Sequence, residues 1–133
     1  MVGLIWLIQI VHYPLFSGVG EAGFVDYQNK HQMWITFIVG PVMAAELLTA
    51  MALAWYPPTV DSGLWLKIGL GLLVVIWLST LLIQIPQHNK LSAGYDPAAL
   101  RGLVWGNWIR TLAWTARGLI LVYVFKRIVE VAQ

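Results

Sequence analysis

Residues 63–85 read GLWLKIGLGLLVVIWLSTLLIQI, and Lys67 is the one charged side chain among them. A helix needs about 20 mostly apolar residues to cross a lipid bilayer. Three further segments have a similar composition: residues 2–16, 33–56 and 102–125. Short connections between helices favour an antiparallel arrangement. The sequence therefore predicts an all-α fold, in which residues 1–133 form a single integral membrane domain built as an antiparallel four-helix bundle.

The composition of the whole chain indicates the same class. Of its 133 residues, 59% are apolar and 11% are charged, and the formal net charge is +2. So few charges cannot cover the surface of a water-soluble monomer, and so much apolar content is atypical of a disordered chain. The absence of Cys excludes thiolate metal sites and iron–sulfur clusters. Because there is no basic run, we expect no nucleic acid as a partner. The apolar composition instead predicts the lipid bilayer as a partner.

The charges outside the predicted spans favour one orientation. We call the side that holds residues 17–32 and 86–101 the upper side, and the opposite side the lower side. Lys126 and Arg127 follow the last predicted span directly. Since Lys and Arg next to a span favour the cytoplasm, we expect both termini on the cytoplasmic side. Six tryptophans lie near expected helix ends, where Trp commonly anchors a protein at the membrane boundary: Trp6, Trp34, Trp55, Trp65, Trp105 and Trp108.

Two charges inside the predicted spans lie at matching depth. Glu46 lies 13 residues after the start of the span 33–56, and Arg117 lies 15 residues after the start of the span 102–125. At 1.5 Å per residue, both are about 20 Å below the upper surface. Ionisable side chains inside a span usually face the bundle interior with a partner. We predict an ion pair between them, which either fixes the helix register or serves a polar ligand or a proton relay.

The last predicted span also carries a polar stripe. Arg110 lies seven residues before Arg117, so both side chains lie on one face of the helix. Asn107 and Trp114 share that face. Because this face is too polar for lipid, we expect it to point into the bundle.

All three histidines belong to the upper half of the predicted bundle. His12 lies near the end of the first span, three residues after Gln9, and His31 directly precedes the second span. His88 follows the third span and lies close to Gln84. Polar side chains from three separate segments are therefore expected in one zone.

Prolines predict that this zone is open rather than sealed. Pro14, Pro41 and Pro86 are expected to bend three of the four helices and to free backbone carbonyls. We therefore predict a polar cavity in the upper half of the bundle. The candidate ligand-binding residues are Gln9, Glu46, Gln84, His88, Asn107, Arg110, Trp114 and Arg117, and the candidate catalytic residues are His12 and His31.

The favoured function is binding of a hydrophobic aromatic or quinone-like small molecule, and the sequence leaves open whether its oxidation follows. Arg110, Arg117 and His12 would bind its oxygen atoms, and Trp, Leu and Ile side chains would hold its apolar body. His12 or His31 would act as a general base, because imidazole titrates near the working pH. The sequence names no cofactor.

Two other functions stay open at this point. A metal site would combine His12, His31 and His88 with Glu21 or Asp26, and a haem would use two of the histidines. Neither HxxxH nor HxxE spacing is present to support it. The other function is that of a non-catalytic accessory subunit in a larger membrane complex. Such a chain would pack against a partner membrane subunit or a second copy of itself, and its buried pairs would only maintain the fold.

Several motifs of the chain resemble small bacterial membrane proteins. They are Trp6-x-x-Gln9-x-x-His12-Tyr13-Pro14-x-Phe16, His31, Glu46, Gln84-Ile85-Pro86-x-His88-Asn89-x-Leu91 and Asn107-Trp108-Ile109-Arg110-Thr111 with Trp114 and Arg117. Together they resemble an uncharacterised family of small bacterial four-helix membrane proteins and, in outline, the anthrone-oxygenase-like membrane domain family. The resemblance implies a bacterial inner-membrane location. Through the second family it also implies oxidation of an aromatic polyketide by dioxygen without a metal. No catalytic residue of that family matches a position here.

Overall fold

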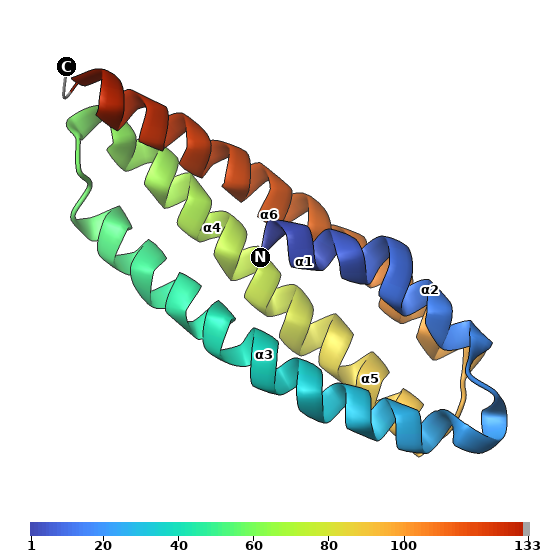
Figure 1. The fold of residues 1–133 in the computed structure, drawn as a ribbon. Helices are drawn as coiled ribbons and strands as arrows, with labels where there is room; N and C mark the ends of the chain where they lie inside the picture. The colour runs from blue at the N-terminus through green and yellow to red at the C-terminus, as the bar shows by residue number, and fades with distance from the viewer. Residues whose placement is uncertain (132–133) are drawn as a thin grey trace.

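The computed structural model describes residues 1–131, and this range is helical with no strand. It forms four long helical segments joined by short turns (Figure 1). The first segment comprises α1 (Val2–Leu7), η1 (Ile8–His12), α2 (Tyr13–Leu15) and η2 (Phe16–Gly18), and the second is α3 (Glu21–Trp55). The third comprises η3 (Val60–Ser62), α4 (Gly63–Ser79), η4 (Thr80–Gln84) and α5 (Ile85–Ala93), and the fourth is α6 (Pro97–Val131). The predicted all-α, four-helix architecture is confirmed.

The segments form an elongated antiparallel bundle (Figure 1). The third segment lies centrally, because α4 packs extensively on α6 and also contacts α3. The first segment packs along α6 and covers only the upper half of the bundle, so its beginning lies about halfway along the molecule in Figure 1. Side chains of all four segments therefore meet in the upper half alone.

The helices extend further than the sequence predicted. Helix α3 begins at Glu21 rather than at residue 33, α5 continues past Pro86 to Ala93, and α6 begins at Pro97 rather than at residue 102. Most of the expected upper loops are thus helical, because hydropathy marks the apolar part of a helix and not its ends. Local signals set the ends instead. At α6 the Asp96 carboxylate accepts the backbone N–H groups of Ala98 and Ala99, at 2.8 and 3.2 Å, as an N-cap does.

Two π-helical turns interrupt the first and third segments. η1 precedes Pro14 and η4 precedes Pro86, which lies in the first turn of α5. A π turn holds one extra residue, and proline lacks the N–H group that a continuous α-helix would use. Buried positions along the third segment show the extra residue: they recur every three or four residues and then step by five, from 79 to 84. The turns thereby direct Gln9 and Gln84 inward, and both are buried. At Pro41, by contrast, α3 continues as one helix.

Buried apolar side chains form two clusters along the bundle. The upper cluster contains Phe16, Phe24 and Leu91, and the middle cluster contains Leu73 and Ile76. The outer faces of the helices are also apolar, with Phe37, Leu82, Trp105 and Val122 among the exposed side chains. By length and composition, Glu21–Trp55 and Val60–Ala93 could each cross a membrane, and Val2–Gly18 is a shorter apolar helix.

Candidate functional site

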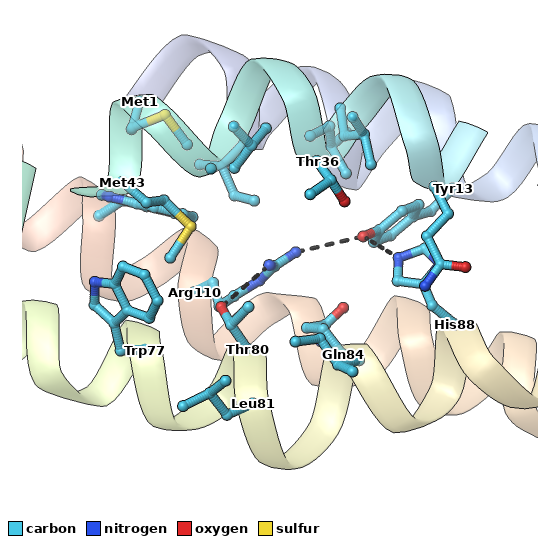
Figure 2. A pocket seen from close by; sticks show the side chains of 18 residues that line it. Met1, Tyr13, Thr36, Met43, Trp77, Thr80, Leu81, Gln84, His88 and Arg110 are labelled. Atoms are coloured by element: carbon cyan, nitrogen blue, oxygen red, sulfur yellow. Dashed lines mark hydrogen bonds between the residues drawn. The ribbon is translucent and has the colours of Figure 1, made fainter. Parts of the chain in front are cut away.

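A cavity of about 240 Å³ lies in the upper half of the bundle. Figure 2 shows it between α3 on one side and α4, η4 and α5 on the other, with Arg110 of α6 reaching in from behind. Its lining is mostly apolar. It is formed by Met1, Ile5, Ile8, Tyr13, Gln32, Ile35, Thr36, Val39, Gly40, Met43, Trp77, Thr80, Leu81, Gln84, Ile85, His88, Arg110 and Trp114.

The cavity has an exposed mouth and a buried floor. Thr36 on α3 and Leu81 on η4 both line the cavity and are both solvent-exposed, so they mark its mouth. Arg110 and Trp114 on α6 form part of the floor, at 6% and 1% exposure. The cavity therefore opens sideways, between α3 and the third segment, and not at an end of the bundle.

A network of neutral polar side chains holds Arg110. Its Nε and Nη2 both donate to Asn107 Oδ1, the former at 2.9 Å. Nη1 donates to Thr80 Oγ1 and Nη2 also donates to the Tyr13 hydroxyl oxygen, each at 3.4 Å. The Asn107 amide donates to Gln9 Oε1 at 2.8 Å, which turns the Asn107 oxygen toward Arg110. Gln9 and Asn107 thus orient the guanidinium without lining the cavity themselves.

The predicted ion pair between Glu46 and Arg117 is confirmed. Arg117 Nη1 lies 3.3 Å from Glu46 Oε1, and Trp114 Nε1 donates to the other carboxylate oxygen at 2.9 Å. The polar stripe of α6 points inward as predicted, since Asn107, Arg110, Trp114 and Arg117 are all buried. Neither member of the ion pair lines the cavity, so their charges satisfy each other next to it.

The three histidines lie along one chain of contacts that leads to the cavity. His12 Nε2 lies 2.9 Å from His31 Nδ1, and the ring centroids of His31 and His88 are 5.4 Å apart. His88 Nε2 lies 3.2 Å from the Tyr13 hydroxyl oxygen, and Gln28 Nε2 donates to His88 Nδ1 at 2.8 Å. Of the three imidazoles, His88 alone lines the cavity. The two candidate catalytic residues, His12 and His31, lie further toward the upper end.

The residues considered for a metal site are distributed as follows. Within residues 1–131, no group of three or more His, Cys, Asp or Glu side chains is arranged to hold a metal ion. Asp26, one of the carboxylates considered for it, instead pairs with Lys30 at 2.7 Å on the surface.

Two buried polar side chains in the cavity wall lack partners. Gln84 is 1% exposed, and among the described residues neither its amide nitrogen nor its oxygen has a hydrogen-bond partner. The indole N–H of Trp77 likewise has no hydrogen-bond partner among the described residues. Buried polar groups are normally hydrogen-bonded, and since these atoms have almost no accessible surface, they would reach an occupant of the cavity only if their side chains turned toward it.

Four of the ten candidate residues line the cavity: Gln84, His88, Arg110 and Trp114. Sequence reasoning missed several polar lining residues, namely Tyr13, Gln32, Thr36, Trp77 and Thr80. Tyr13 adjoins His12 in the chain, and that adjacency was the available signal for it. For Thr80 no signal was available, because a Thr hydroxyl in an apolar helix commonly bonds only to the preceding turn. Thr80 does this too, donating to Ile76 O at 2.8 Å.

Comparison with known proteins assigns no family to the chain. No protein-family model, no curated protein and no solved structure matches it. The resemblance to the two four-helix families stays a prediction, and function has to be argued from the geometry of the site.

Proposed function

We propose that this chain is an integral membrane protein that binds a hydrophobic aromatic or quinone-like molecule in the cavity beside α3. The observation that carries the proposal is the combination of apolar walls with a buried polar floor. Arg110 lies on that floor, and Tyr13, Gln84 and His88 are further polar side chains of the lining. Small-molecule sites commonly have this composition, a mostly apolar lining with a few polar groups that fix orientation.

The spacing of exposed anchors supports placement in a bilayer. Trp34 and Trp55 lie 21 residues apart on α3, which is about 31 Å of helix. Trp105 and Lys126 have the same spacing on α6. The hydrocarbon core of a bilayer is about 30 Å thick, and Trp collects at its two boundaries. Between these anchors the outward side chains are apolar apart from Thr36 and Thr49, as expected for a surface in contact with lipid.

This placement puts the cavity in the upper leaflet. Arg110 follows Trp105 by five residues, so it lies about 8 Å below the upper boundary. The mouth at Thr36 and Leu81 then faces lipid. An apolar molecule would enter sideways from the bilayer, with its polar group leading.

The cavity volume limits the part of the ligand that is enclosed. An apolar cavity of about 150 Å³ admits benzene, whereas this one measures about 240 Å³. One substituted aromatic ring fits, and a longer apolar tail would extend through the mouth into lipid.

Blocking the mouth tests the proposal. Leu81→Trp fills it, whereas Leu82→Trp adds the same side chain at the neighbouring position, which is 71% exposed and outside the cavity. Organic extracts of the detergent-purified proteins are compared by mass spectrometry. We expect an aromatic or quinone-like compound with the wild type and Leu82→Trp, and about tenfold less with Leu81→Trp. Equal amounts in all three proteins, or lipid alone, would contradict the proposal. Oxygen uptake with the reduced form of the extracted compound then tests whether oxidation follows binding.

A second cavity favours the accessory-subunit function as the alternative. It measures about 400 Å³, lies in the lower half and is lined by Ala54, Trp55, Lys67 and Leu70. Such a hollow would accept a side chain from a partner membrane subunit or from a second copy of the chain. Native mass spectrometry from mild detergent separates the two functions, because an accessory subunit would leave the membrane with its partner and without a small molecule.

A further inference from the structure

We infer that the cavity binds an anionic oxygen group, a carboxylate or an ionised phenol, and that Arg110 supplies its counter-charge. The inference rests on the proposed binding function and specifies which end of the ligand reaches the floor. It starts from a difference between the two buried arginines.

Only one of these two arginines has a carboxylate partner. Arg117 pairs with Glu46 at 3.3 Å. Arg110 is equally buried, yet among residues 1–131 it forms no salt bridge. Its acceptors are the neutral oxygens of Asn107, Thr80 and Tyr13. A buried cation without an opposite charge is costly to keep out of water, so an anion brought by a ligand would be bound strongly.

The guanidinium is held in a way that leaves its outer N–H groups available. Asn107 Oδ1 accepts from Nε at 2.9 Å and also, over a shorter distance, from one N–H of Nη2. The outer bonds to Thr80 and Tyr13 are both 3.4 Å, at the weak end of the hydrogen-bonding range. An anionic oxygen would form shorter, charge-assisted bonds. Asn107 would hold the guanidinium in place while the ligand's oxygen replaced Thr80 and Tyr13 as the acceptor of its remaining N–H groups.

The rest of the lining carries no competing anion. The Gln84 amide N–H₂ and the Trp77 indole N–H have no partners in the described structure. The lining includes no Asp or Glu side chain. Arg110 is therefore the cationic donor of this lining, and no carboxylate in the lining competes with a ligand for it. The apolar wall formed by Ile5 and Val39 would hold the uncharged body of the ligand.

A matched pair of ligands tests the inference. The probes are 4-hexylbenzoate and its methyl ester, which share the ring and the tail but differ in charge, titrated calorimetrically into the detergent-purified protein. We expect the benzoate to bind at least about tenfold more tightly, a difference near 1.4 kcal/mol. An alkylphenol made acidic by two nitro groups distinguishes phenolate from carboxylate as the favoured anion.

Variants assign the charge preference to Arg110. Arg110→Gln should remove the preference for benzoate over ester, and Arg110→Lys should keep part of it. Arg101→Gln is the control, because Arg101 is exposed and outside the cavity. Should Arg110→Gln fail to fold, judged by its thermal unfolding, Gln84→Leu replaces it and should weaken benzoate binding more than ester binding.

The outcomes separate this inference from the function on which it rests. Equal affinity of the wild type for benzoate and ester would overturn the inference and leave the binding function standing. Failure of both probes and of any extracted compound to bind would overturn the binding function itself. An unchanged charge preference in Arg110→Gln would also overturn the inference, because the counter-charge would then lie elsewhere.

Discussion

Glu46 has two partners on α6, and both depend on its charge. Arg117 Nη1 lies 3.3 Å from one carboxylate oxygen, and Trp114 Nε1 donates to the other at 2.9 Å. Replacing a single partner leaves the opposite charge buried and unpaired, whereas replacing both leaves none. The pair therefore connects α3 to α6 through a contact that is most sensitive to the replacement of one partner alone.

We expect Glu46→Gln and Arg117→Leu each to lower the free energy of unfolding by about 3–5 kcal/mol. The double variant should recover most of that loss, because the two effects are coupled. Thermal unfolding in one detergent, followed by circular dichroism, measures all four proteins. A double variant less stable than either single one would mean that the two charges do not interact.

For whole helices, apolar content predicted where the four segments lie, but it did not predict the residues at which they begin and end. The sequence located all four segments, and equal offsets along two spans were enough to pair Glu46 with Arg117. It did not reveal the two π turns, because apolar content does not report which backbone N–H bonds to which carbonyl. The side chains that meet at the cavity depend on helix rotation, which each π turn changes. Gln84 was a candidate because it is polar and close to His88 in the chain, whereas nothing in the sequence indicated that Thr80 and Trp77 line the same cavity.

The π turn η4 can be tested by removing one residue. Deleting Leu82 should let the third segment continue as an α-helix, and it would rotate the part above by about 100° relative to the part below. Gln84 and His88 would then leave the interior, and we expect a loss of about 3 kcal/mol or more in unfolding free energy. Leu82→Ala, which keeps the chain length, is the control. A deletion protein as stable as this control would show that the extra residue has no structural role.

For the whole molecule, insertion into a membrane predicts which residues contact water and which contact lipid. The chain contains no Cys, so single cysteines report exposure without background. In cells, Asn29→Cys near the upper end of α3 should react with a membrane-impermeant maleimide, and Phe37→Cys, two turns further on, should not. Asp61→Cys on the lower side should react only after permeabilisation, because the termini are predicted to be cytoplasmic. If Phe37→Cys reacted at the same rate as Asn29→Cys, insertion into the membrane would be contradicted. If Asp61→Cys reacted in intact cells, the predicted orientation would be wrong and the termini would lie outside.

Under the proposed function a ligand enters from lipid through the mouth between Thr36 and Leu81, and this affects how its affinity has to be expressed. A molecule that enters from lipid is in equilibrium with its mole fraction in the bilayer, not with its concentration in water. Adding empty vesicles would dilute it within the membrane phase and lower occupancy, although neither protein nor ligand had changed. Two ligands with the same contacts in the cavity would then differ in apparent aqueous dissociation constant by the ratio of their partition coefficients. Tail length would raise the apparent affinity through partitioning alone, while selectivity would be left to the few polar atoms on the cavity floor.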